Sequence, residues 1–564
     1  MCCQHNKFWE YLRSIYKSLS FIERSFVITI TSIVVASALG ILYIAHKDST
    51  VIVPADGGTL VEGIVGTPRF INPLLAQTDA DRDLTVLVYA GLMRALPEGG
   101  LIPDIAETYE VSEDETVYTF ILKKNIFFHD NTPITADDVV FTVQSAQDPR
   151  IGSTKAAAWE GVLVSATDEH TVVFTLPRPY AGFLSNTTLG ILPRHIWSNI
   201  TAEDFMGSSQ NEHPIGSGPF MITKIKERSG KTSEYILKPF ERYSLGKPHI
   251  SKISIRIFGN EKELISAFSN GDIDSFRMSD PVSFSSSSAE TEDIRRYPLP
   301  RTFGLFLNYN KNPIFTDTAV RKALSLAISR SEIVNTVLGG FGTPIFTPLP
   351  PHIYEKASDN NSSNKEVHSL LKSAGWNRDA ETGLYMKGEQ SLSFSIKTVN
   401  SPEMKLTAEL LQKQFGEAGF AVSVELFDLA QLNQTVIRTR DYEALLFGQV
   451  LSRDGDLYPF WHSSQRNDPG LNVALYTNVQ VDAILEKLRT TSTYDERIRL
   501  YESFLDEWQS DAPAVFLYVP DLVYVLPEHI KGVHEGPIQE PSGRFLDAYR
   551  WYMYTQRIFT FLLN

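Results

Sequence analysis

Apolar and polar residues alternate in several short stretches between positions 118 and 257. Period-two alternation places successive side chains on opposite faces of a strand, so these stretches predict half-buried β-strands. The predicted strands cover 118–122, 171–176, 220–225, 234–238 and 253–257. The sequence RSGK at 228–231 is typical of a tight turn, which predicts that the third and fourth strands form a hairpin.

Helical periodicity alternates with these strands. Thr135 before Ala136–Gln147 and Ser401 before 402–415 are typical helix N-caps. Further helices are predicted over 319–338, 429–439, 481–489 and 495–509. From 302 to 520 strands and helices follow one another in an order that predicts a mixed α/β lobe with a largely parallel sheet.

One long segment near the N-terminus is predominantly apolar. Residues 26–44 (FVITITSIVVASALGILYI) carry no formal charge. At about 1.5 Å rise per residue this helix would be roughly 28 Å long, near the thickness of membrane hydrocarbon. Basic residues precede it, so the positive-inside rule leaves residues 1–25 in the cytoplasm and the body of the chain outside.

A cleaved signal peptide is the competing interpretation of this segment, because Ala36-Ser37-Ala38 resembles a cleavage site. The apolar run continues to Ile44 and a long segment precedes it, so we favour an uncleaved transmembrane helix followed by a tether over 45–57. Cys2 and Cys3 precede the apolar run, whereas a lipoprotein signal would place its cysteine after it.

Composition and charge narrow the class of protein. With 43% hydrophobic and 21% charged residues, the 564-residue chain is ordinary globular material, long enough for two or three lobes. The formal net charge is −15, and residues 1–47 contribute +3, which leaves −18 for the rest. Such an acidic body argues against nucleic acid as a partner. Its lack of cysteine excludes disulfides and thiolate metal sites there.

Motifs of catalysis are missing from the sequence. It contains no Gly-x-Ser-x-Gly, no His-Glu-x-x-His, no Walker loop and no Gly-x-Gly-x-x-Gly. His129 and Asp130 could suggest a metal or acid–base site, but two neighbours without further converging groups are more typical of a polar turn. We therefore predict no enzymatic activity, no cofactor and no metal, with an exported hydrolase as the alternative.

Several motifs in one order resemble a known family. They are, along the chain, 58–60 (GTL), 68–73 (PRFINP), 101–107 (LIPDIAE), 128–139 (FHDNTPITADDV), 216–220 (GSGPF), 320–330 (VRKALSLAISR) and 461–465 (WHSSQ). The family is that of the large extracellular solute-binding proteins of the peptide and nickel class, family 5, which serve ABC importers. Asn131 stands where the family usually has glycine, a mild departure because asparagine tolerates a left-handed backbone.

The resemblance implies an α/β fold of the periplasmic-binding-protein-like II type, with two lobes and an extra inserted domain. By position, the predicted parts are lobe I over 58–92, an inserted domain over 93–212, more of lobe I over 213–300, lobe II over 301–520 and the end of lobe I over 521–564. The implied function is capture of a peptide or peptide-like solute between the lobes, by a monomer that delivers it to ABC permease subunits.

The family holds peptides largely through main-chain hydrogen bonds, with an acidic side chain meeting the ligand's amino group, which offsets the desolvation of the buried ammonium. Carried over by position, one lining segment contains Thr78, Asp79 and Ala80. The facing segment contains Gly448 and Val450, after the predicted strand 443–447, where glycine would allow a close backbone approach.

The loop after this strand should hold the amine-binding aspartate. Asp454 is our first choice and Asp456 the second, with a solvated Asp-Gly turn as the alternative. Arg453 and Arg69 could meet a ligand carboxylate, although surface arginine is the plainer interpretation. Trp461 and Phe460 could line side-chain pockets, or they could belong to the core.

The fold does not fix the ligand. A nickel chelate, haem, an oligosaccharide or an opine stays open as an alternative solute. A membrane-anchored sensor or adhesion module that binds without transport is the third class of function.

Overall fold

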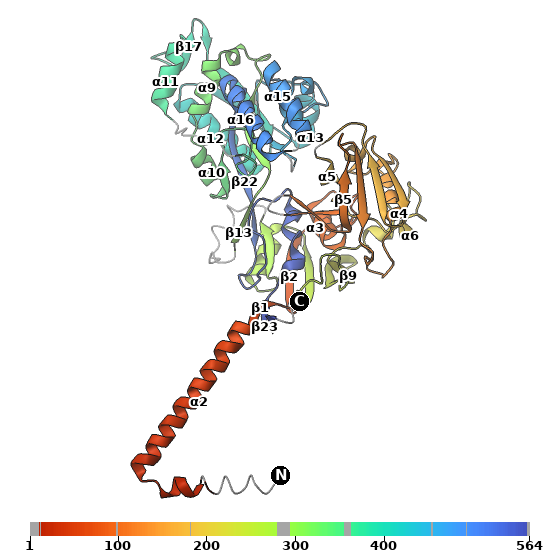
Figure 1. Ribbon diagram of the computed structural model, residues 1–564. Coiled ribbons are helices and arrows are strands. Elements are labelled where there is room, and N and C mark those ends of the chain that lie inside the picture. The colour runs from red at the N-terminus through yellow and green to blue at the C-terminus, as the bar shows by residue number, and fades with distance from the viewer. Residues whose placement is uncertain are drawn as a thin grey trace. The chain divides into compact units, whose positions relative to one another are not determined.

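The structure is a computed structural model that describes residues 11, 13–96, 100–180, 182–278, 294–354, 363–452, 455–491 and 493–560. Cys2, Cys3, Arg453 and Asp454 lie outside the described residues. The chain divides into two compact units (Figure 1). One comprises Met1–Asp56 with Tyr552–Asn564, and the other comprises Gly57–Trp551.

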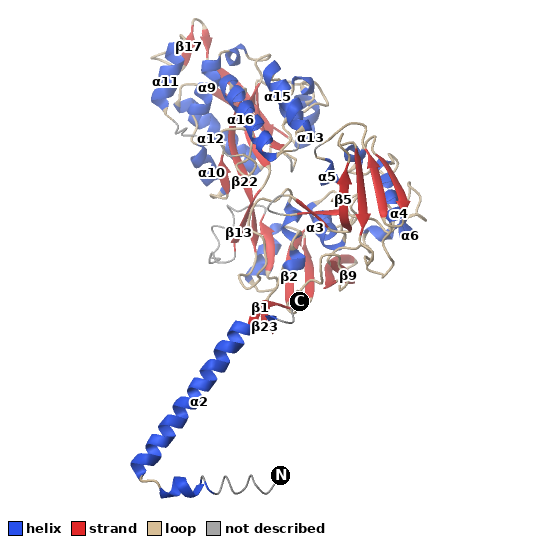
Figure 2. Cartoon of the chain, in the orientation of Figure 1, coloured by secondary structure: helices blue, strands red, loops and turns tan. Residues whose placement is uncertain are grey.

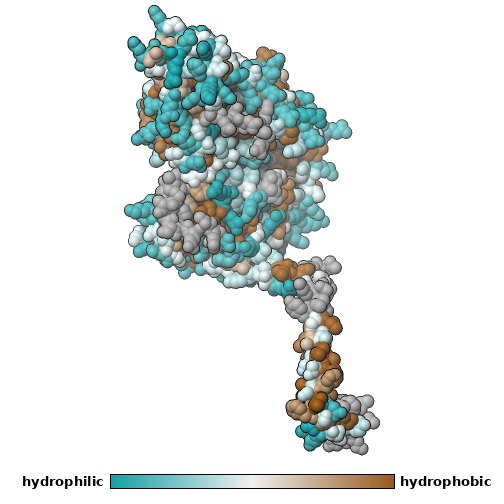
Figure 3. Space-filling model, turned by 90° about the vertical axis from the view of Figure 1, so that its left-hand side faces the viewer, coloured by the Kyte–Doolittle hydropathy of each residue, from teal (hydrophilic) through white to brown (hydrophobic). Residues whose placement is uncertain are grey.

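The smaller unit contains a long apolar helix and a two-stranded sheet. Helix α2 (Phe21–Ser49) begins at a capping box, in which the Glu23 carboxylate accepts from the Ser20 backbone N–H at 2.8 Å. Its segment Phe21–Ile41 has a mean hydropathy of 1.8 and no buried part, so it is long and apolar enough to cross a membrane. Figure 3 shows the hydrophobic colour along this helix. The predicted span 26–44 lies inside it.

Strand β1 (Thr50–Ala55) pairs antiparallel with strand β23 (Tyr554–Phe559). In the range 45–57, predicted as a tether, the helix continues to Ser49 and a paired strand follows. The alternation in TVIVPA fits this strand, but its partner lies about 500 residues away in the chain, where local sequence gives no sign of it.

A twelve-stranded sheet runs through the larger unit in the order β20-β19-β21-β14-β22-β12-β2-β11-β10-β9, with β13 and β15 also paired to β22. The bounds are β2 Thr59–Val65, β9 Phe220–Arg228, β10 Lys231–Pro239, β11 Lys252–Phe258, β12 Ser275–Met278, β13 Ile294–Pro298, β14 Arg301–Leu307, β15 Gly342–Pro344, β19 Ser393–Val399, β20 Ala421–Phe427, β21 Ala444–Val450 and β22 Ala514–Val525.

Strand β22 belongs to both lobes. Its first residues pair with β14, and its last residues pair with β12 and β13, all antiparallel. In lobe I, β2 is parallel to β11 and β12, and α7 (Glu261–Ser269) packs on these three strands. Strands β9 and β10 form the predicted hairpin, with Arg228 opposite Lys231.

The sheet of lobe II is mixed. Strand β19 is parallel to β20 and β21, but β14 is antiparallel to β21 and β22. The prediction of a largely parallel sheet was therefore only half correct, because the chain enters the lobe along β14 and leaves it along β22 in the opposite direction. Leu305 and Leu307 face one hydrophobic core and Phe306 faces another, so both faces of β14 are buried.

Helices cover both faces of this sheet (Figure 2). Their bounds are α9 Thr318–Leu326, α10 Arg330–Leu338, α11 Asn364–Ser373, α12 Pro402–Glu417, α13 Leu429–Gln431, α14 Tyr458–Trp461, α15 Val479–Thr490 and α16 Tyr494–Asp511. The single helix predicted over 319–338 is two helices, because Ser329 caps a new start by accepting from the Glu332 N–H at 3.3 Å. A small sheet of β16 (Asn377–Arg378), β17 (Tyr385–Lys387) and β18 (Gln390–Ser391) extends from the lobe.

Within the predicted range 93–212, four antiparallel strands form a separate sheet in the order β5-β6-β8-β7. The elements of this region are β3 Met93–Ala95, β4 Leu101–Pro103, β5 Ala106–Val111, β6 Val117–Leu122, α4 Ala136–Gln147, β7 Leu163–Asp168, β8 Thr171–Thr175, α5 Phe183–Asn186 and α6 Arg194–Trp197. Helix α4 packs on β7 and β8, and Asp138 in its first turn accepts from the Thr135 N–H at 2.9 Å.

Candidate functional site

The first predicted lining segment lies where the chain enters α3 (Asp79–Val88). Thr78 is the N-cap, and its Oγ1 accepts from the Asp81 N–H at 3.1 Å. The Asp81 carboxylate accepts from the backbone N–H groups of Arg69, Phe70, Gln77 and Thr78, at 2.7–3.2 Å. Burial acts to raise the pKa of Asp81, but these hydrogen bonds outweigh it and lower the pKa. The Asp81 carboxylate therefore binds the backbone of two segments, 69–70 and 77–78, and fixes both at the start of α3.

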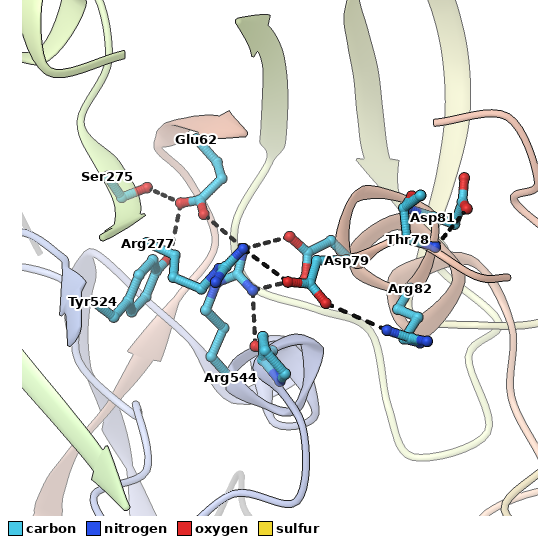
Figure 4. A network of polar contacts seen from close by, with 11 residues as sticks. Glu62, Thr78, Asp79, Asp81, Arg82, Ser275, Arg277, Tyr524 and Arg544 are labelled. Atoms are coloured by element: carbon cyan, nitrogen blue, oxygen red, sulfur yellow. Dashed lines mark hydrogen bonds and ion pairs between the residues drawn. The ribbon is translucent and has the colours of Figure 1, made fainter. Parts of the chain in front are cut away.

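Asp79 and Ala80 follow in the first turn of α3. Asp79 forms ion pairs with Arg82 at 3.3 Å and with Arg277 at 2.9 Å, while its side chain stays 37% exposed (Figure 4). Ala80 is buried. The carboxylate of Asp79 therefore already has two cationic partners, and the side chain of Ala80 faces the protein.

A buried charge network fixes the other side of α3 (Figure 4). Arg544, in the short helix η7 (Pro541–Phe545), donates to both oxygens of Asp83 at 2.7 and 2.6 Å and to Glu62 at 3.1 Å. Glu62 also accepts from the Tyr524 hydroxyl at 2.8 Å and from Ser275. Burial raises the pKa of Glu62 despite the positive charge of Arg544. This network joins α3 to β2, β12, β22 and the C-terminal segment.

The second predicted segment is the end of β21. Strand β14 pairs with every residue of β21, but β19 pairs only with Ala444 and Leu445. Among the described strands, none therefore covers the second main-chain edge at Gly448 and Val450. A side chain at Gly448 would place its Cβ 2.9 Å from the Phe303 ring, so packing inside the lobe also requires glycine here.

Asp456 and Trp461 have structural partners of their own. Asp456 accepts from Arg489 at 2.6 and 3.0 Å, and its side chain is 12% exposed. Trp461 has no exposed surface and packs edge-on against Trp508, with ring centroids 5.5 Å apart, and Phe460 packs on the same core. We therefore correct the assignment of Trp461 to a ligand pocket: it belongs to the core of lobe II.

A cavity of about 480 Å³ lies beside both predicted segments. It is lined by one face of α3, β3, two segments of the inserted domain, residues 539–546, and Ser452 of lobe II. Its walls include Ala76 and Arg82, which flank the first segment, and Ser452, which follows the second. None of the described residues predicted for the site lines this cavity itself.

Sequence reasoning missed Tyr89 and Arg94, which do line it. A signal was available, because Arg94 is the one charged residue in the apolar run AGLMRAL at 90–96, and a charge in such a run must find a partner or a ligand. Within the described part of the chain, no three His, Cys, Asp or Glu side chains gather closely enough to hold a metal ion.

Comparison with known proteins identifies chains of similar sequence and architecture. Residues 100–468 match the model of the bacterial extracellular solute-binding proteins, family 5 Middle. The oligopeptide-binding protein AppA of Bacillus subtilis is 27% identical over 497 residues, covering 86% of this chain and 90% of AppA. The structure of AppA with a nonapeptide is similar with a TM-score of 0.65 and 26% identity, covering 89% of this chain and 100% of AppA.

The crystal structure of the ABC transporter substrate-binding protein CtaP from Listeria monocytogenes gives a TM-score of 0.73 at 28% identity, covering 88% of this chain and 99% of CtaP. The family model covers well over half of the chain. The chain therefore belongs to the bacterial extracellular solute-binding proteins of family 5, which are binding proteins that act outside the cytoplasm.

Proposed function

We propose that this protein captures peptides outside the cytoplasm and delivers them to the permease subunits of an ABC importer. The observation that carries the proposal is the similarity to an oligopeptide-binding protein along 90% of that protein's length, which includes both lobes and the inserted domain. Membership in a family of binding proteins, and a sequence without nucleophile–base motifs, support a protein without enzymatic activity.

The main chain of the protein would provide most of the contacts with the peptide. The edge of β21 at Gly448 and Val450 has no partner among the described strands, and an extended peptide can add to such an edge whatever its side chains are. Thr78, Asp79 and Ala80 would face it with main-chain groups of the rigid turn that Asp81 holds. Backbone pairing of this kind suits a protein that accepts many peptide sequences.

The ligand's amino group needs an acidic partner. The Asp456 carboxylate already forms an ion pair with Arg489, and this supports Asp454 as the amine-binding residue. A ligand that contacts both lobes would favour their closed arrangement, with strand β22, which pairs in both lobes, as part of the connection that bends. We further propose that the protein acts as a monomer, and that α2 stays in the membrane as its anchor.

Isothermal titration calorimetry of the full chain in detergent tests this function. We expect binding of at least some peptides from a panel of two to nine residues, with a negative heat-capacity change because apolar surface is buried. Absence of binding across the whole panel would reject peptides as the ligand.

Two aspartate variants test the assignment of the amine partner. Asp454→Asn should weaken binding about tenfold or more, because a buried ammonium would lose its counter-ion. Asp456→Asn is the matched control, and should leave peptide affinity within about twofold because Asp456 serves Arg489. The reverse result would move the amine site to Asp456.

A further inference from the structure

The two-stranded sheet β1–β23 leaves large apolar side chains exposed. Ile52 is 60% exposed and Phe559 is 41% exposed. Neither strand pairs with any other described strand, so the sheet is an isolated ribbon. Because an isolated two-stranded ribbon is only marginally stable in water, it needs a further surface to pack against.

The two exposed apolar side chains share one face of the ribbon with a cation. Side chains alternate between the faces of a strand, and residues paired across two strands lie on the same face. Ile52 is paired with Arg557, and Thr50 is paired with Phe559. Ile52, Arg557 and Phe559 therefore lie on one face, which we call the open face. The apolar β-branched residues of the other face are partly buried: Val51, Val53 and Ile558.

The connection to α2 brings the ribbon to a lipid surface. The apolar run ends at Ile44 and the helix continues to Ser49, which adds about 8 Å at 1.5 Å rise per residue. The headgroup layer is roughly 5–8 Å thick on each side of the hydrocarbon. With α2 in the membrane, Thr50 emerges at the outer limit of the headgroups, and Phe559 lies beside it because the two are paired. Figure 1 shows both strands directly at the end of α2.

The charge of the ribbon suits a surface that carries phosphates. Arg557 is the only charged residue in the sequences TVIVPA and YTQRIF of the two strands, within an otherwise acidic exported body. Its Nη1 donates to Oγ1 of Thr50 at 3.2 Å, which turns the guanidinium toward the end of the ribbon next to α2. A guanidinium has five N–H donors, so this one contact leaves donors for a lipid phosphate.

We propose that the open face of the ribbon, with Ile52, Arg557 and Phe559, rests on the headgroup region of the membrane that α2 spans. The inference rests on the membrane anchor proposed above for α2, and it adds a second contact with the same membrane. Even a whole acyl chain binds a membrane only marginally, so the ribbon supplements the anchor and does not replace it. The contact fixes the segment after the anchor at the lipid surface.

Fluorescent labels at single cysteines test this contact. Ile52→Cys, Phe559→Cys and Gln556→Cys would each be made in the full chain, with Cys2→Ser and Cys3→Ser because these are its natural cysteines. The labelled chains would be reconstituted into vesicles of phosphatidylcholine and phosphatidylglycerol. Gln556 is the matched control, since it is exposed on the same strand but lies on the other face. Lipids with a spin label near the headgroup should quench labels at 52 and 559 about threefold more than the label at 556.

A pair of charge variants tests the part of the cation. Arg557→Gln on the open face and Gln556→Glu on the other face both lower the net charge of the ribbon by one unit. We expect Arg557→Gln to reduce the quenching of a label at position 52 about twofold or more, and Gln556→Glu to leave it unchanged. Equal quenching in the two variants would overturn the role of Arg557 and with it the contact as proposed.

The anchor and the ribbon contact fail in different ways. A chain that floats with the vesicles but shows equal quenching at 52, 556 and 559 overturns the contact of the open face and leaves the anchor standing. A chain that does not float overturns both. Labels at 52 and 559 that are shielded from iodide in the water, yet not quenched by the spin-labelled lipid, would show that protein covers the face, which also overturns the lipid contact.

Discussion

His129 shows how one side chain of a recognisable motif acts through distant backbone. Its Nε2 lies 3.0 Å from the carbonyl of Gly218, and its Nδ1 accepts from the Gly216 N–H at 3.4 Å, which together suit a neutral ring. Asp130 accepts from the Thr132 N–H at 2.9 Å, and Asn131 has a left-handed φ of 69°. The interpretation of His129-Asp130 as a turn is confirmed, and the ring also ties the turn to the loop at 216–218.

The pKa of His129 predicts a pH dependence of stability. Burial lowers this pKa to about 4, whereas an unfolded histidine titrates near 6.5. Between these values the unfolded chain binds the proton and the folded chain does not, so stability should fall as the pH drops from about 6.5 to about 4. In that window the wild type should lose about 1 kcal/mol more per pH unit than His129→Gln.

Urea denaturation of both proteins from pH 4.5 to pH 7 measures this difference. The pKa of His352 is also lowered to about 4 by burial, but it contributes equally to both chains and cancels. Parallel pH profiles for the two proteins would contradict the assignment.

Removing Arg544 from its buried charge network should cause a large loss of stability. Arg544→Met leaves Glu62 and Asp83 buried without their cation, which should cost about 3–5 kcal/mol in the free energy of unfolding. Arg150→Met is the control, since its 64% exposed side chain pairs with Asp148 at the surface and should cost under about 1 kcal/mol. Similar shifts in the urea midpoints of the two variants would argue that the buried network contributes little.

At the scale of elements, capping residues set where helices begin, whereas the contacts of these residues with distant backbone are set by the tertiary structure. Ser401 accepts from the Met404 N–H at 3.3 Å and starts α12 where the sequence predicted. Helix α3 had no sequence-level assignment, although Thr78 and Asp81 form a capping box. The reach of Asp81 back to Arg69 and Phe70 is a tertiary feature that capping rules do not contain.

Asp81→Ala should therefore loosen the start of α3 and the loop before it. Four backbone N–H groups lose their charged acceptor, so we expect a loss of about 2 kcal/mol or more in stability. Hydrogen exchange should become faster at the amides of Arg69 and Phe70. Asp79→Ala, which breaks only partly exposed ion pairs, should leave those amides protected; faster exchange there as well would mean that the ion pairs hold the loop.

At the scale of the whole molecule, one long strand belongs to both lobes. Strand β22 is 12 residues long and pairs with strands of both lobes, so a movement of one lobe against the other has to bend this strand. Gln539 donates to the carbonyl of Leu451 at 2.6 Å, a contact between the C-terminal segment and lobe II. Such joints favour a few discrete lobe arrangements.

The anchor proposed for α2 makes a prediction at this scale. The full chain should fractionate with membranes and keep its own N-terminus, because a span of about 20 apolar residues inserts stably. A chain without residues 1–49 should be released from membranes and bind peptides with unchanged affinity. Mass spectrometry of the protein from cells gives the readout, and a mature N-terminus near Ala38 would show that the segment is a cleaved signal instead.

The sequence by itself determined several strands, most helices, the apolar N-terminal segment and the family, because these follow from periodicity, caps and ordered motifs that neighbouring residues carry. Prediction from periodicity also failed locally at Ser329, because this residue caps a new helix inside the range 319–338, for which periodicity predicted a single helix. The paired strands β1 and β23, the direction of β14 and the core position of Trp461 were decided only by tertiary structure.

The candidate site divides in the same way. The segments predicted from motif position, 78–80 and 448–456, lie next to the cavity, but the cavity wall itself comes from segments hundreds of residues apart. Arg94 meets Asp104, Tyr243 and Leu546 only after folding, so its partners cannot be read from the chain. Local sequence fixes which hydrogen bonds a residue can donate, and the fold alone decides which acceptors it meets.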